Sequence, residues 1–180
     1  MTMGSALGAA VSMGALLASC AVATPLAITS TGPGIARGSS VAMTMPEQSQ
    51  SERGRFSNAL GKAMMARNVE VSEVEPDKKA ELLADFSVSI TDASSGVLNG
   101  KGQYAEGEAE QDWITPPRRD RRFDKCEAKR LRATLVLFDA NTGKMVYRGS
   151  GEATDCEFDD ADLAALADRL VEDALTRSGR

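Results

Sequence analysis

The chain has 180 residues, 21 basic and 26 acidic side chains, a formal net charge of −5 and no histidine. A mildly acidic protein is a poor nucleic-acid binder over its whole surface. The lack of histidine removes the commonest general base and metal ligand and excludes a Ser-His-Asp triad. We therefore expect a protein that is not an enzyme and that uses no cofactor and no metal.

The N-terminal segment carries no charged side chain before Arg37, and residues 3–19 form the apolar run of an export signal. The run ends in Leu17-Ala18-Ser19-Cys20, the lipobox pattern. The lipoprotein peptidase requires small side chains beside the bond that it cleaves, and the cysteine thiol carries the diacylglycerol. We predict a signal peptide over 1–19 and a lipid anchor on Cys20, since several acyl chains together hold a protein on a bilayer. Ala21 is not the aspartate that retains lipoproteins in the inner membrane, so we expect a periplasmic protein anchored to the outer membrane.

Two alternatives to the lipid anchor stay open. The start of the chain has no basic residue, which is unusual for an export signal. The stretch Ala21-Val22-Ala23 also fits ordinary signal peptidase, whose cleavage would release a soluble periplasmic or secreted protein. An uncleaved anchor is the third possibility.

Composition divides the rest of the chain into a tether and one domain. Residues 20–40 are rich in Gly, Pro, Ser and Thr, and predict a flexible tether. A single domain over 41–180 follows. It opens with a strand at 41–45, then a helix from a capping box at Ser49 and Glu52 to about Asn68. Short and long alternating strands are predicted at 69–72 and 83–91.

The second half of the domain combines a hairpin with a helix. Residues 96–125 predict a long polar loop, and the strands 131–138 and 144–150 flank an Asn/Gly turn. Residues 160–177 carry apolar side chains at helical spacing. This order predicts an α+β fold of two layers, in which two helices cover one face of a twisted, mostly antiparallel sheet of four or five strands.

The two cysteines of the domain fall in register on the predicted hairpin. Pairing about its turn places position i opposite roughly 283 − i. Cys126 then lies within one residue of Cys156, as a cross-strand disulfide requires. We predict that disulfide. The alternatives are two separate buried thiols or, with too few ligands to favour it, a zinc site.

The long loop holds the best candidate binding residues. Its acidic half is followed by Trp113 and then by Arg118, Arg119, Arg121 and Arg122. Four arginines beside a tryptophan could hold a protein partner, or the phosphate groups of an anionic lipid or glycan. The alternative is a solvated loop whose two halves neutralise each other.

Acidic residues also cluster before the last helix, from Asp155 to Asp162. Carboxylates at this density could chelate calcium, but the EF-hand glycine and glutamate are missing. Negative charge at a helix start stabilises the helix dipole, and Asp160 can serve as the cap. We favour capping.

Three pieces of the chain carry a family resemblance. They are the strand Ala84-Asp85-Phe86-Ser87-Val88, the hairpin Leu135–Gly149 with its D-x-x-T-G and Y-R-G motifs, and the final helix. In these the chain resembles small lipoproteins grouped as domain of unknown function family 4136. The resemblance implies an envelope location and a mixed α/β fold, and it supplies no catalytic residues.

Together these features predict an envelope lipoprotein that acts as an accessory or structural protein. We expect it to bind another envelope component, of unknown identity, through the long loop or an open sheet edge. The alternative is a binder of anionic lipid or glycan that uses the four loop arginines. No nucleic-acid partner is expected.

Overall fold

The computed structural model describes residues 24–46, 48, 51–75, 79–94, 97–98, 113–115 and 126–178. Its strands and helices follow one another in the order β1 (Thr24–Thr31), β2 (Ser40–Met43), α1 (Glu52–Met65), β3 (Glu70–Glu73), β4 (Leu82–Asp92), β5 (Val97–Leu98), β6 (Trp113–Thr115), β7 (Lys129–Asp139), β8 (Met145–Asp155) and α2 (Asp160–Arg177). None of the helices in these ranges is long and apolar enough to cross a bilayer.

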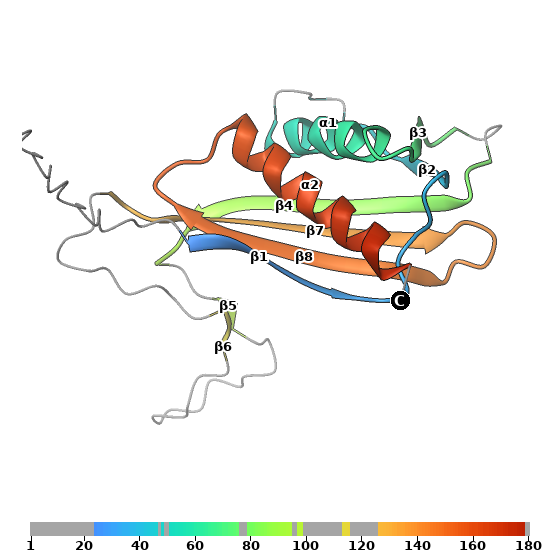
Figure 1. Ribbon diagram of the computed structural model, residues 1–180. Coiled ribbons are helices and arrows are strands. Elements are labelled where there is room, and N and C mark those ends of the chain that lie inside the picture. The colour runs from blue at the N-terminus through green and yellow to red at the C-terminus, as the bar shows by residue number, and fades with distance from the viewer. Residues whose placement is uncertain are drawn as a thin grey trace, which may run out of the picture.

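Six strands form one mixed, open sheet in the order β1-β8-β7-β4-β2-β3. The neighbouring pairs β1–β8, β8–β7 and β7–β4 are antiparallel, and β2 runs parallel to both β4 and β3. Both helices lie on the same face of the sheet (Figure 1). The predicted α+β, two-layer class is confirmed. The sheet has six strands, one more than the upper limit of the four or five expected.

The additional strand is β1, which occupies residues that we predicted to be part of a flexible tether. Thr24–Thr31 pairs antiparallel with β8 and forms one edge of the sheet. Leu26 and Ile28 are half-buried and pack against the core. The composition hides this strand because its Thr, Ser and Pro residues are equally typical of linkers. Its order depends on the partner strand, which lies more than 100 residues later.

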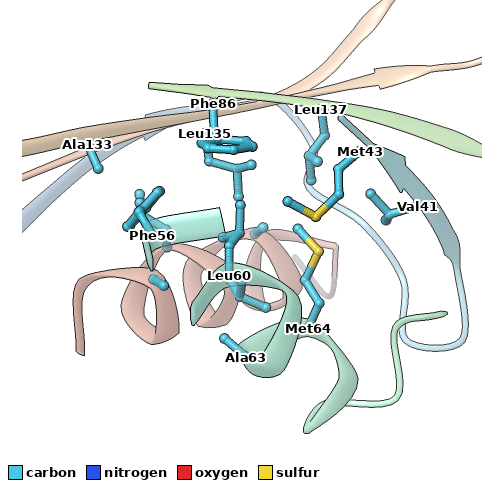
Figure 2. Packing of buried hydrophobic residues seen from close by; sticks show 14 of the residues in the cluster. Val41, Met43, Phe56, Leu60, Ala63, Met64, Phe86, Ala133, Leu135 and Leu137 are labelled. Carbon is cyan, nitrogen blue, oxygen red and sulfur yellow. The ribbon is translucent and has the colours of Figure 1, made fainter. Parts of the chain in front are cut away.

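The core fills the space between the sheet and the helices. Phe56, Leu60 and Met64 of α1 are fully buried. They face Phe86 of β4 and Leu135 of β7 from below the sheet (Figure 2). Apolar side chains at three- and four-residue steps thus meet strand positions that alternate between the two faces, as helical and strand periodicities require.

Both helix starts differ by a residue or two from the predicted caps. Ser51 caps α1, because its hydroxyl accepts from the Gly54 N–H at 3.1 Å. Asp159, not Asp160, caps α2 and forms a reciprocal capping box with Asp162. Local side-chain geometry chooses among neighbouring cap candidates that the sequence presents as equivalent.

The hairpin and its disulfide match the prediction closely. Lys129 lies opposite Asp155, one residue from the predicted register. The Cys126 and Cys156 sulfur atoms are bonded, and their Cα atoms are 5.7 Å apart. The strands β5 and β6 form a separate two-stranded sheet within the predicted loop of residues 96–125.

Candidate interaction surfaces

The D-x-x-T-G motif builds the β7–β8 turn. One carboxylate oxygen of Asp139 accepts from the backbone N–H groups of Asn141 and Thr142 and from the Thr142 hydroxyl, at 3.1, 2.7 and 2.8 Å. Gly143 completes the turn at φ +66°, a conformation that glycine adopts without strain. The hydrogen bonds from Thr142 lower the pKa of Asp139. The motif therefore has a structural role at this turn.

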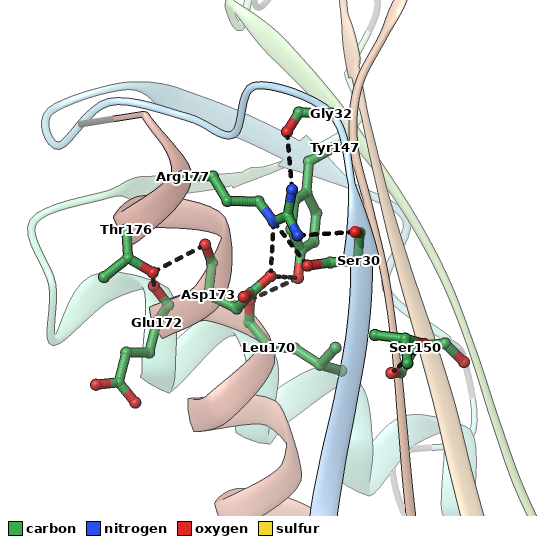
Figure 3. Close-up of polar contacts among 10 residues, drawn as sticks. Ser30, Gly32, Tyr147, Ser150, Leu170, Glu172, Asp173, Thr176 and Arg177 are labelled. Carbon is green, nitrogen blue, oxygen red and sulfur yellow. Dashed lines mark hydrogen bonds and ion pairs between the residues drawn. The ribbon is translucent and has the colours of Figure 1, made fainter. Parts of the chain in front are cut away.

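The Y-R-G motif fixes α2 to the sheet. The Tyr147 hydroxyl lies 3.1 Å from the Leu170 carbonyl oxygen and 3.0 Å from an Asp173 carboxylate oxygen (Figure 3). The tyrosine ring lies along β8 over Gly149, where a Cβ atom would stand 2.0 Å from the hydroxyl oxygen. The glycine is required because this ring occupies its side-chain space.

Arg177 extends this cluster to β1. Its guanidinium donates to the Ser30 hydroxyl at 2.7 Å and to the Ser30 carbonyl at 2.8 Å (Figure 3). It also lies 3.4 Å from the Asp173 carboxylate. Burial, together with the nearby negative charge of Asp173, raises the pKa of Tyr147. These polar groups join β1, β8 and α2, and their bonds leave them little capacity for chemistry on a ligand.

The acidic run before α2 is divided among separate tasks. The Asp155 carboxylate accepts from the Cys156 N–H, Asp159 caps the helix, and Asp160 pairs with Arg55 of α1 at 2.9 Å. Among the described residues, no three metal-ligating side chains gather at one point. Asp159 therefore caps the start of α2, while Asp155 and Asp160 bond to other partners.

One charged cluster escaped the sequence analysis. On the sheet face opposite the helices, Glu152 of β8 pairs with two arginines of β7, with Arg130 at 3.1 Å and with Arg132 at 2.8 Å. Arg130 is only 8% exposed. The alternation of Arg130 and Arg132 with apolar Leu131 and Ala133 was the available signal, because it assigns the arginines to the open face.

Several chain segments converge at one end of the sheet. β1 begins there with Thr24 opposite Thr154, β4 ends at Asp92, β7 begins at Lys129 and β8 ends at Asp155. The Cys126–Cys156 disulfide joins the segments next to β7 and β8. We call this region the disulfide end. Both stems of the 96–125 segment therefore emerge beside the start of β1.

The predicted binding residues lie mostly outside this description. Trp113 is placed by its backbone in β6, opposite Leu98. The four arginines 118, 119, 121 and 122 and the predicted lipidation site Cys20 lie outside the described residues. The predicted roles of all six residues stay predictions.

Comparisons with known proteins support the fold alone. Neither a family model nor a curated protein matches the chain. The chain is similar to the PelC dodecamer from Paraburkholderia phytofirmans at 11% identity and a TM-score of 0.50, over 84% of this chain and 98% of that one. A substituted form of PelC gives 11% identity, 83% and 97% coverage and a TM-score of 0.45. A PDZ domain protein from Parabacteroides distasonis is 12% identical, with a TM-score of 0.44. The match covers 82% of this chain and 34% of that one.

Proposed function

We propose that the chain is a non-enzymatic envelope lipoprotein, anchored to the outer membrane through Cys20, that binds another component of the envelope. The position of β1 carries this proposal. β1 begins at Thr24, four positions after Cys20, and a fully extended chain of that length spans about 14 Å. An acylated Cys20 would therefore hold the disulfide end close to the membrane surface.

The arrangement of carboxylates supports a role without catalysis. Glu81 and Asp139 line a surface depression of about 310 Å³ near the β7–β8 turn. A general acid needs a pKa near the working pH. Asp139 has a lowered pKa and donors on its carboxylate, so it is poorly suited to that task.

A second candidate function is the binding of anionic lipid or glycan by Arg118, Arg119, Arg121 and Arg122. The anchor geometry favours it, because both stems of the segment that holds these arginines emerge at the disulfide end. The same anchor that positions this end near the membrane would bring the arginines close to phosphate headgroups, which guanidinium groups bind well.

The anchor is tested by the intact mass of the exported, unreduced protein. We expect a chain that begins at Cys20, carries acyl groups and has lost two hydrogens to the disulfide. A mature chain that begins at Thr24, or a full-length chain with three free thiols, would contradict the proposal. Cys20→Ser is the matched variant, and it should abolish acylation and membrane retention together.

The second candidate is tested with vesicles that contain phosphatidylglycerol. Replacement of the four loop arginines by serine should abolish binding of the Cys20→Ser protein, and replacement by lysine should largely preserve it. Binding should also weaken as salt is raised, since exposed charges are screened. Binding that is indifferent to both the serine replacement and the salt concentration would remove this candidate.

A further inference from the structure

Unequal strand lengths leave one side of β4 open. β4 pairs with β7 over its whole length, from Leu82 to Asp92. On its other side, β2 pairs only with Leu82–Ala84. Within the described part of the chain, residues 85–92 therefore have a neighbouring strand on one side only, and Figure 1 shows β2 and β3 confined to one end of β4.

The backbone of this segment directs hydrogen-bonding groups to the open side. Alternate residues of an antiparallel strand point their N–H and C=O groups in opposite directions. The Phe86 N–H donates to the Asp85 carboxylate at 2.9 Å and not to β7. The backbone N–H and C=O groups of Phe86, Val88 and Ile90 therefore point away from β7. Within the described residues, no strand pairs with Val88 or Ile90 on that side. Such a row is a template for an added strand.

The side chains define what an added strand would carry. Val88 and Ile90 are half-buried on the helix face and pack against the core. Ser87, Ser89 and Thr91 are exposed on the other face. An added strand would place apolar side chains beside Val88 and Ile90 on the helix face, and polar side chains beside the serine and threonine residues on the other face. At the β2 end, Arg53 covers the Phe86 ring, with its guanidinium carbon 4.7 Å from the ring centroid.

The other edges of the sheet are less suited to strand addition. Arg177 already donates to the outward-facing Ser30 carbonyl of β1, and Pro25 lacks an N–H near the start of that strand. β3 has four residues with an exposed glutamate at each end. Charge, proline and short length are the usual protections of an edge strand. In the described residues, the open segment of β4 has fewer of these protections.

We infer that residues 85–92 of β4 form a strand-addition site for an extended segment of a partner protein, with apolar and polar side chains in alternation. The inference rests on the proposed function, because the anchor decides between a partner and a second copy. A two-fold symmetric pair of β4 edges would be antiparallel, with one copy turned end for end. That arrangement would point the Cys20 of one copy away from the membrane that holds the other.

Amide hydrogen exchange of the exported protein in detergent tests the site. The probe is an eight-residue peptide with valine at alternate positions, threonine between them and lysine at both ends. We expect at least tenfold slower exchange at Val88 and Ile90 on addition of the peptide, and no change at Ser87 and Ser89. Methylation of the peptide amides that face β4 should abolish the effect, and methylation of the opposite set should preserve it.

Val88→Pro provides a test from the protein side. This substitution removes an N–H that faces the open side and costs no bond to β7, so the disulfide and the thermal transition should persist while peptide binding is lost. Equal effects of the two methylated peptides would overturn the inference. Slow exchange at Val88 and Ile90 without peptide would also overturn it. Protection that does not change with protein concentration would mean that the chain covers its own edge, and protection that increases with protein concentration would mean that a second copy covers it. Loss of the Cys20 anchor, seen by mass, would instead contradict the proposed function.

Discussion

Strands β7, β8 and β1, with α2, are joined by backbone and side-chain hydrogen bonds, an ion pair and a disulfide, whereas β2 and β3, on the other side of β4, are four-residue strands. The β8 side has two eleven-residue strands that pair antiparallel, a disulfide and the Tyr147–Asp173–Arg177 cluster. On the other side of β4, the short strand β2 pairs with only three residues of β4, and its apolar side chains pack in the core with those of α1. The covalent link and the side-chain polar links are thus concentrated on the β8 side of the sheet, whereas the open edge of the described residues lies on the side of β2 and β3.

Removal of the disulfide should have the largest effect on this contrast. Replacement of both Cys126 and Cys156 by serine frees a closed loop with a sequence separation of 30. The chain-entropy relation then gives a loss of about 3–4 kcal/mol of unfolding free energy. Urea denaturation of the oxidised protein and the variant measures this loss. A change below about 1 kcal/mol would show that the β8 side does not depend on its covalent link.

Alanine at Gly149 should be the next most damaging change, because a Cβ there would lie 2.0 Å from the buried Tyr147 hydroxyl. We expect a loss of about 2–3 kcal/mol from overpacking. Gly151→Ala is the matched control on the same strand. Its Cβ would meet the ends of the flexible Leu166 and Ile28 side chains, which can move. Thermal unfolding of both variants should rank them in this order, and the reverse order would refute the packing argument.

Tyr147→Phe should cost about 1–2 kcal/mol, since it removes the hydroxyl from Leu170 and Asp173. The raised pKa of Tyr147 also predicts a pH dependence. An unfolded tyrosine ionises near pH 10, so this contribution is complete below about pH 10 and is lost as the pH rises further. The phenylalanine variant should lack that alkaline loss in a pH series of unfolding measurements. An identical alkaline profile would show that another group is responsible.

The ion pair between the helices links the two sides and should contribute less. Both terminal guanidinium nitrogens of Arg67, just beyond the end of α1, donate to the Asp168 carboxylate on α2. The pair is partly exposed, so Arg67→Ala should cost about 0.5–1 kcal/mol. The hydrogen bond from Arg67 lowers the pKa of Asp168, so this stability is present above about pH 4 and is lost as the pH falls further. Asp168→Asn should remove this loss of unfolding free energy at acid pH, as measured by a pH series of denaturation curves.

Alanine at Gly61 should be the smallest change and of opposite sign. A Cβ at this position on α1 would meet nothing within 4 Å. Glycine in a helix interior costs about 0.5–1 kcal/mol relative to alanine, so Gly61→Ala should stabilise the protein by that amount. A higher midpoint in chemical denaturation checks this. A lower midpoint would mean that the β4 side is packed more tightly than its described contacts indicate.

The sequence was informative wherever the relevant signal is local. The Asp139–Lys144 turn, the alternation in β4 and the apolar stripe of α2 each depend on neighbouring residues, and each was predicted. The disulfide followed because a tight turn sets the register of both strands. The Arg130–Glu152–Arg132 cluster was missed although its alternation was visible, because pairing across strands needs the register residue by residue.

Local chemistry along the chain thus determined the α+β class, the hairpin and its disulfide. The tertiary structure decided what depends on distant partners. Residues 24–31 are a strand because β8 lies beside them, and among the described residues one side of β4 is open beyond Ala84 because β2 ends at Met43. Strand edges are set by where other strands stop, and no residue within β4 encodes that limit.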